Sequence, residues 1–197
     1  MARQPRKTIF FVLIVLIIFA TVGLVVYSLR IQQRYQEALR AQIIKDNTMG
    51  TLLLTSPVFQ HNREIPARYT CQGDEVNPEL LIQGTPSGTR SLVLIMDDPD
   101  APVGVWDHWV LWNIAPETTE IAENSTPPGA VVGVNSGGQT RYQGPCPPSG
   151  THRYQFTVYA IMDVLSLAPG SDKQTVLKAI TGKVLDQCTL VGLYEKS

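Results

Sequence analysis

A single stretch, Gly144–Tyr154, constrains the fold of this chain more than any other. It reads GPCPPSGTHRY and opens with one glycine and three prolines, which favour a stiff, non-helical loop. The next residues, 155–161, read QFTVYAI and are β-branched and aromatic enough to form a strand. The chain therefore passes directly from a rigid loop into a strand at this point.

His152 and Tyr154 lie at this junction. Side chains alternate along a strand, so both residues share a face with Phe156. Because Phe156 favours a buried core, the two polar rings are expected at the rim of that core, beside the loop. Two interpretations are open from this stretch alone, a polar cap at the edge of a sheet or a binding site.

A second stretch, Asp98–Pro102 followed by 106–109, gives weight to the binding site. A strand-like segment precedes its acids and another follows His108. The acids and the histidine thus lie where buried strands run into loops, which is a usual place for binding chemistry. Two prolines restrain the residues before them, so a stiff turn carries the carboxylates of Asp98 and Asp100.

Short apolar runs separated by proline, glycine and asparagine continue through the chain from Leu52 onward. The expected strands are 80–82, 91–96, 109–113, 131–134, 155–161 and 189–194. A helix is expected near the end, capped by Ser171 or Asp172 and stopped by Gly182. Several short strands with long loops are typical of two sheets packed face to face. We predict a mainly β fold with a few peripheral helices.

Residues 9–29 form an apolar stretch without a charged side chain. About 20 such residues cross a bilayer as a helix, so we predict one N-terminal transmembrane helix that acts as an uncleaved signal anchor. A cleaved signal peptide is the alternative, with Arg3, Arg6 and Lys7 as its basic region. The apolar region of a signal peptide is usually shorter than this stretch.

The predicted organisation has four parts: a basic tail over 1–8, the transmembrane helix over 9–29, a helical stalk over 30–50 and a folded domain over 51–197. A short basic tail before a first transmembrane span usually stays on the cytoplasmic side of the membrane. We therefore expect a single-pass protein of the cell membrane with an extracytoplasmic domain. The net charge of −1 gives no basic patch, which argues against nucleic acid as a partner.

Three motifs, taken in order, resemble those of the phosphatidylethanolamine-binding protein family. They are DPDAP at 98–102, HWV at 108–110 and GPxPPxGxHRY at 144–154. A YTCxG stretch at 69–73 and LVGLY at 190–194 extend the resemblance from Leu52 to the C-terminus. It is closest to the bacterial and archaeal (YbhB-like) branch and more distant from the Raf kinase inhibitor proteins.

The resemblance implies a β-sandwich with Greek-key-like sheets and a small pocket for phosphate or phosphorylethanolamine-like head groups. It also implies a binding or regulatory module that is not an enzyme and uses no cofactor. Carried over by motif, the ligand-binding residues are Asp98, Asp100, His108, Pro145, His152 and Tyr154.

Other chemistry can be built from these side chains. Two histidines and a carboxylate suit a metal, but a metal site leaves Tyr154 unused. A hydrolase needs a nucleophile, and Ser149 lies in a loop with no GxSxG motif. The same side chains could form a general acid–base pair, but the sequence shows no motif for a second substrate. An anion pocket uses the whole set, because imidazoles, a phenol and loop N–H groups donate to oxygen while each carboxylate fixes a histidine tautomer.

The three cysteines are too scattered for a zinc site. Cys71 and Cys146 lie in motif segments that should meet near the pocket. Two states are open: a disulfide between them that leaves Cys188 free, or three buried thiols.

We therefore predict a membrane-anchored, non-enzymatic binding protein with an anion pocket. An inhibitor of serine proteases in the envelope or outside the cell is the alternative, with the protease as its partner. Its inhibitory loop would be 117–129, which carries prolines and no periodicity. A metal-dependent or other hydrolase is the third candidate.

Overall fold

A computed structural model of the protein describes residues 23–24, 26–37 and 52–196. The chain divides into two compact units, Met1–Asn47 and Thr48–Ser197, and each is described by itself. The predicted basic tail over 1–8 and the expected domain boundary at residues 50 and 51 lie outside the described residues.

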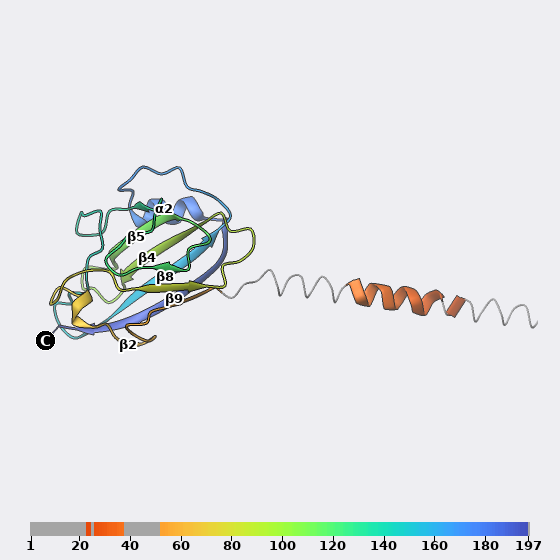
Figure 1. The fold of residues 1–197 in the computed structure, drawn as a ribbon, viewed down its shortest axis with the longest axis horizontal. Helices are drawn as coiled ribbons and strands as arrows, with labels where there is room; N and C mark the ends of the chain where they lie inside the picture. Colours follow the sequence, from red (N-terminus) through yellow and green to blue (C-terminus); the bar gives the residue numbers. More distant parts are fainter. Residues whose placement is uncertain (1–22, 25, 38–51, 197) are drawn as a thin grey trace, which may run out of the picture. The chain divides into compact units, whose positions relative to one another are not determined.

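Two β-sheets build the C-terminal unit (Figure 1). The small sheet has the order β1-β3-β6, with β1 at Leu53–Thr55, β3 at Leu80–Gln83 and β6 at Glu120–Ile121. The large sheet has the order β2-β9-β8-β4-β5-β7. Its strands are β2 (Arg63–Glu64), β4 (Ser91–Asp98), β5 (Trp106–Ile114), β7 (Val131–Val132), β8 (Thr151–Ile161) and β9 (Val184–Glu195). Neighbouring strands are antiparallel, except that β2 runs parallel to β9.

Strand β8 returns from the far edge of the large sheet to pair with β4. The order β8-β4-β5-β7 is that of a Greek key, in which the fourth strand comes to lie beside the first. This return brings the segment that follows Gly144 against the strand that ends at Asp98. The two stretches that the sequence points to, 35 or more residues apart in the chain, therefore become neighbours at one end of the sheet.

The first hydrophobic core lies between the two sheets. The small sheet contributes Leu54, Ile82 and Ile121, and the large sheet contributes Met96, Trp109, Tyr154, Phe156, Val158 and Leu190. All of these side chains are buried. Burial of one such side chain contributes roughly 1.5–3 kcal/mol. The apolar side chains that alternate along the strands therefore hold the two sheets together.

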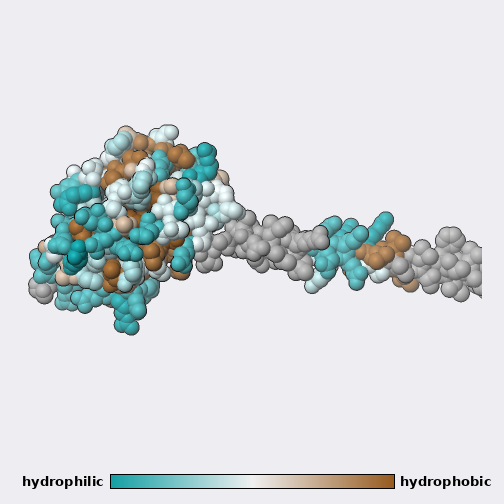
Figure 2. Space-filling view, viewed as in Figure 1, coloured by the Kyte–Doolittle hydropathy of each residue, from teal (hydrophilic) through white to brown (hydrophobic). Residues whose placement is uncertain are grey.

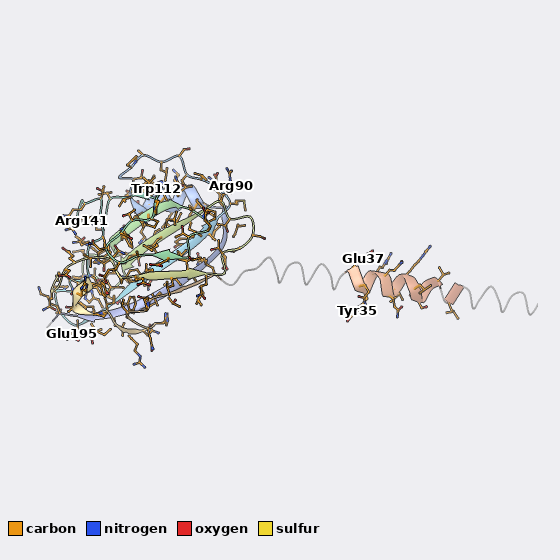
Figure 3. The ribbon with its side chains drawn as sticks, viewed as in Figure 1. Tyr35, Glu37, Arg90, Trp112, Arg141 and Glu195 are labelled. Atoms are coloured by element: carbon orange, nitrogen blue, oxygen red, sulfur yellow. A yellow bond between two sulfur atoms is a disulfide. The ribbon has the colours of Figure 1, made fainter. Side chains whose placement is uncertain are left out.

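The second core lies on the other face of the large sheet, beneath α2 (Lys173–Ile180). Val176 and Ile180 of the helix pack with Val110 and Trp112 of β5, and Figure 3 labels Trp112 in this region. Asp172 caps the helix by accepting a hydrogen bond from Thr175 N at 2.8 Å. Figure 1 shows α2 lying over this part of the sheet.

A β-bulge interrupts the pairing of β4 with β5. Met96 lies opposite Trp109 but Asp97 lies opposite Asp107, so His108 is the extra residue. A bulge changes the face toward which the neighbouring side chains point. Trp109 belongs to the core between the sheets, whereas Asp107 binds Lys173 of α2 on the opposite face. The bulge therefore places Asp107 and Trp109, which are two residues apart and would otherwise share a face, on opposite faces of the sheet.

The predicted N-terminal transmembrane helix over 9–29 is corrected by the structure. No helix among the described residues is long and apolar enough to cross a membrane. The helical residues 26–37 carry Arg30, Arg34 and Glu37, all exposed. Figure 2 shows the described helix as hydrophilic toward residue 37 and hydrophobic toward residue 23, and Figure 3 labels Glu37 on it. These charged residues follow the apolar stretch 9–29, and the described helix therefore lacks the run of about 20 apolar residues that a span needs.

Residues 9–22 and 25 of the predicted span, and residues 38–50 of the predicted stalk, lie outside the described residues. The predicted location in the cell membrane with an extracytoplasmic domain rested on that span. It is withdrawn together with the span.

Candidate functional site

A cavity of about 240 Å³ opens at the end of the large sheet where β4 ends and where β5 and β8 begin. Three strand ends and two loops supply its walls. The lining residues are Asp98, Ala101, Pro102, Val103, Trp106, His108, Gln143, Gly144, Cys146, Pro147, Pro148, His152 and Tyr154.

Four of the six residues predicted for the ligand site line this cavity, namely Asp98, His108, His152 and Tyr154. The other two lie beside it. Asp100 is on the outer side of the turn, and Pro145 is buried behind the wall, where its carbonyl oxygen accepts a hydrogen bond from Cys71 N at 3.1 Å. The structure thus brings the two sequence motifs together around one cavity.

His152 is paired with Asp98 across strands β8 and β4. Nδ1 of the histidine lies 2.6 Å from Oδ2 of the carboxylate, and the residues are only 7% and 3% exposed. A carboxylate oxygen can only accept, so Nδ1 carries the hydrogen and Nε2 is left for the cavity. The pair has the form that the sequence analysis expected of a carboxylate that fixes a histidine tautomer.

Asp98 is itself held in place by the turn that follows it. Its second oxygen, Oδ1, accepts a hydrogen bond from the backbone N–H of Asp100 at 2.8 Å. Asp100 in turn accepts three hydrogen bonds from Arg153, one from the backbone N–H and two from the guanidinium. The Arg153 guanidinium lowers the pKa of Asp100 to about 2. Asp100 therefore fixes the turn to β8 instead of holding a histidine.

His108 is held by Gln143 and not by a carboxylate. The backbone N–H of Gln143 donates to the His108 carbonyl at 3.1 Å, and Nδ1 of His108 donates to the Gln143 carbonyl at 2.8 Å. The amide oxygen of Gln143 also accepts from Nε1 of Trp106 at 3.1 Å. Burial lowers the pKa of the His108 imidazole below its ordinary value of 6.5.

Tyr154 forms the floor of the cavity and is fully buried. Its ring meets His108 edge-on, with centroids 5.2 Å apart, and lies nearly parallel to His152 at 6.5 Å. Its hydroxyl is one of two buried side-chain polar atoms in the described part of the chain that have no hydrogen-bond partner. Burial, and to a smaller extent the nearby Asp98, raise the pKa of this phenol. The backbone of Cys146 lowers that pKa, although it forms no hydrogen bond with the hydroxyl.

The loop wall of the cavity is fastened to the segment 69–75. Cys146 and Cys71 form a disulfide with their Cα atoms 5.4 Å apart, and the hydroxyl of Tyr142 donates to the carbonyl of Tyr69 at 2.8 Å. A Cβ on Gly144 would lie 2.8 Å from the same carbonyl oxygen. Only a glycine allows the two segments to approach this closely.

Behind the site, on the helix side of the sheet, one cation neutralises two carboxylates. Nζ of Lys173 lies 2.6 Å from Oδ2 of Asp97 and 2.8 Å from Oδ1 of Asp107. These aspartates face each other across β4 and β5 and directly adjoin Asp98 and His108 in the chain. Lys173 thus ties together the two strand ends that carry the site.

Sequence reasoning missed several lining residues. Trp106 lies in the stretch 106–109 that the sequence analysis singled out. Nothing in its spacing indicates that it donates a hydrogen bond to Gln143. Gln143 itself precedes the proline loop and carries no motif signal, because its contact with His108 depends on the bulge in β5. The rim residue Val103 is 78% exposed at the tip of a turn, which periodicity alone treats as an ordinary loop position.

The pattern that defines the phosphatidylethanolamine-binding protein family matches residues 55–195 of the chain. This range contains both sheets, the cavity and all the residues described above. The chain belongs to the phosphatidylethanolamine-binding protein family. The resemblance inferred from three motifs is thereby confirmed, and the chain is a binding protein of this family.

Relatives are found in archaea and bacteria. A UPF0098 protein of Methanothermobacter thermautotrophicus is 47% identical over 148 residues, which cover 73% of this chain and 98% of the relative. Among solved structures, a phosphatidylethanolamine-binding protein homologue from Chlamydia trachomatis is 39% identical with a TM-score of 0.73, covering 75% of this chain and 99% of that one. YbcL of Escherichia coli, described as a new member of the mammalian family, is 26% identical with a TM-score of 0.70 and coverages of 74% and 99%.

The structure bears on two other functions considered from the sequence, a metal site and inhibition of a protease. In the described ranges, no three His, Cys, Asp or Glu side chains cluster as metal ligands. The loop 117–129, expected as an inhibitory loop, is held to the domain by hydrogen bonds: Asn77 bonds to Ala122 and Ser125, and Glu123 bonds to Tyr69. Inhibition of a protease stays a prediction.

Proposed function

We propose that this family member is a non-enzymatic binding protein whose cavity holds a phosphate-like oxyanion, such as inorganic phosphate or the head group of a phosphorylethanolamine-like molecule. The observation that carries the proposal is the hydroxyl of Tyr154. It is buried in the floor of the cavity without a partner, and leaving such a group unpaired costs about 1–3 kcal/mol. A ligand oxygen would supply the missing acceptor.

Two further features support an oxyanion. Nε2 of His152 faces the cavity from a ring whose Nδ1 is bound to the carboxylate of Asp98. Hydrogen bonds in which one partner is ionised, as an oxyanion is, are the stronger ones. The rim is mainly apolar, with Val103, Pro147 and Pro148, and suits the carbon chain of an organic phosphate.

The absence of a serine, threonine or lysine nucleophile supports a role in binding. Among the lining residues of the cavity there is no serine, threonine or lysine, and Cys146 is engaged in the disulfide. Covalent catalysis needs an activated nucleophile beside a base. We therefore favour a ligand that is held and released unchanged.

Calorimetric titration of inorganic phosphate and phosphorylethanolamine into the purified protein tests the proposal, with Tyr154→Phe as the matched variant. This change removes one hydroxyl and leaves the ring. We expect phosphate affinity to fall about 10- to 150-fold, while the unliganded protein is as stable as the wild type or more so, because an unpaired buried group is gone. No measurable binding of either compound to the wild type would refute the proposal.

A further inference from the structure

We infer that the protein has a second binding site, apart from the oxyanion pocket, and that this site takes a neutral polyhydroxyl ligand such as a monosaccharide. The second cavity measures about 230 Å³. Three loop segments supply its walls, 75–77, 124–126 and 140–142, and β5 contributes Trp109. It shares no lining residue with the oxyanion pocket.

Neighbouring residues of the chain line the two cavities. His108 lines the oxyanion pocket and Trp109, the next residue of β5, lines the second cavity. In the facing segment Gln143 belongs to the oxyanion pocket and Tyr142 to the second cavity. The rings of Trp109 and Tyr142 meet edge-on with their centroids 5.6 Å apart. The bulge in β5 and the segment that faces it thus separate the two sites.

The indole N–H of Trp109 is a donor without an acceptor. Trp106 donates its Nε1–H to Gln143, and Nε1 of Trp112 is sealed in the core beneath α2. Trp109 is only 2% exposed, and its Nε1 forms no hydrogen bond within the described residues. It is not one of the two unpaired atoms that are closed off from solvent. Its nitrogen therefore reaches the open space beside the ring, which is the second cavity.

One carboxylate and one guanidinium stand in the walls, and their charges cancel. Nη2 of Arg141 lies 3.6 Å from Oε2 of Glu75, which is too far for a hydrogen bond. Each group is held from elsewhere: Nη1 of Arg141 donates to the Tyr142 carbonyl at 2.9 Å, and Oε1 of Glu75 accepts from the N–H of Gly144 at 3.4 Å. Both therefore keep capacity to bond a ligand.

The walls are fixed before a ligand arrives. The buried side chain of Asn77 accepts from Ser125 N at 2.9 Å and donates to the Ala122 carbonyl at 2.9 Å, which fastens the loop over the cavity. The hydroxyl of Tyr142 donates to the Tyr69 carbonyl at 2.8 Å. A site assembled in advance loses less conformational entropy when it binds.

A neutral polyhydroxyl molecule matches this set of groups. Each of its hydroxyls can donate and accept, so it can bond the acceptor Glu75 as well as the donors Arg141 and Trp109. The hydroxyls of Thr126 and Thr140, which form no hydrogen bond in the described part of the chain, add groups of the same kind. An anion would meet the carboxylate and a cation the guanidinium. A zwitterion would have to separate the two charged groups to reach both.

The three tryptophans of the chain give three indole N–H signals in the nuclear magnetic resonance spectrum of the ¹⁵N-labelled full-length protein. Trp106→Phe and Trp112→Phe assign the signal of Trp109 by elimination. Titration with D-glucose, D-mannose and N-acetyl-D-glucosamine in the millimolar range should shift the Trp109 signal saturably with at least one sugar. The signals of Trp106 and Trp112 should stay in place, because one N–H is already bonded and the other is sealed.

Arg141→Met keeps the length of the side chain and removes its donors, so the affinity for that sugar should fall about 10-fold. Arg90→Met is the matched control. Arg90 is also an exposed arginine in a loose ion pair, 4.0 Å from Asp163, and Figure 3 shows it on the opposite side of the domain from Arg141. The control should leave the affinity unchanged.

Four outcomes would overturn the second site as described. No shift of the Trp109 signal with any of the three sugars would mean that the cavity holds only water. Equal shifts of all three indole signals would indicate an effect of the solvent. A shift with the zwitterion glycine and with none of the sugars would overturn the class of ligand. Unchanged sugar affinity in Arg141→Met would place the ligand elsewhere. Each of these outcomes leaves the oxyanion pocket standing, because the two cavities have no residue in common.

Discussion

His108 and Gln143 hold each other through two hydrogen bonds, one from each partner. The Gln143 N–H donates to the His108 carbonyl, and the His108 ring donates to the Gln143 carbonyl. Because His108 is the bulged residue of β5, its backbone is free of the ladder and available to a loop. The same bulge therefore supplies a ring to the cavity and a point of attachment for the wall that follows Gln143.

The burial of the His108 ring predicts a pH dependence of stability. The folded pKa of His108 lies below the unfolded value of 6.5, so as pH falls below about 6.5 the unfolded chain binds a proton that the folded one resists. The free energy of unfolding should therefore decrease between about pH 6.5 and pH 5. Urea denaturation at fixed ionic strength across this range measures it.

His108→Gln should flatten that part of the pH profile, since glutamine does not titrate. His61→Gln is the control, because its exposed ring should leave the profile as in the wild type. An unchanged slope in His108→Gln would assign the pH dependence to other groups.

Lys173 should matter more for stability than a surface lysine does. Its ammonium lies between Asp97 and Asp107, and all three side chains are mostly buried. Lys173→Met keeps the aliphatic length but leaves two facing carboxylates unpaired, which we expect to destabilise the domain by about 1–3 kcal/mol. The midpoint of urea denaturation at unchanged m-value would report the loss.

The triple variant Lys173→Met, Asp97→Asn, Asp107→Asn separates charge from packing. If repulsion between the carboxylates causes the loss, removing their charge should restore most of the stability. A triple variant as unstable as Lys173→Met would place the effect in the packing of the lysine stem.

Much of the large sheet could be predicted from the sequence. The expected strands 91–96, 109–113, 155–161 and 189–194 all lie within observed strands, because alternating apolar side chains there report burial directly. The site residues that end or begin those strands, Asp98 and His152, were found because stiff proline loops adjoin them. The helix was found through its cap at Asp172 and the glycine after it.

What the sequence could not reveal depends on contacts distant in the chain. The bulge at His108 has no residue signature, and without it Gln143 and Trp106 have no reason to be linked to the site. The sequence groups Asp100 with Asp98 because the two are close in the chain, but the strand ends at Asp98 and the Asp100 side chain binds Arg153 in the turn. The apolar stretch near the N-terminus predicted a span from composition alone, and that prediction was wrong by the finding on the described helices.

The disulfide should contribute stability and hold the loop wall. Cys71 and Cys146 are 75 residues apart, and a native cross-link of this kind typically stabilises by about 2–4 kcal/mol. Adding a reductant, or the double change Cys71→Ser, Cys146→Ser, should lower the thermal midpoint. Counting thiols on unreduced, denatured protein should give one, from Cys188.

A matched control is available in Cys188→Ser. Burial raises the pKa of the Cys188 thiol to about 11, so it should react slowly in the folded protein. Its replacement should leave the effect of the reductant intact. Three reactive thiols in the denatured, unreduced protein would contradict the cross-link.

The pair of Asp98 and His152 gives the sharpest comparison between binding and stability. His152→Ala removes the ring nitrogen that faces the cavity, and we expect phosphate affinity to fall about 10- to 150-fold. Asp98→Asn acts indirectly. The carboxylate accepts from His152 with one oxygen and from Asp100 N with the other, whereas an asparagine has a single acceptor oxygen for both. The histidine should therefore be less firmly oriented, at a smaller cost in affinity of about 10-fold.

Asp100→Asn is the matched control for Asp98→Asn, since it changes the neighbouring carboxylate of the same turn. Its side chain binds Arg153 outside the cavity, and its backbone bond to Asp98 is retained. It should leave phosphate affinity unchanged in a calorimetric titration. If Asp100→Asn weakened binding as much as Asp98→Asn, the general charge of the turn would explain the effect, and the orientation of His152 by Asp98 would not be what the ligand depends on.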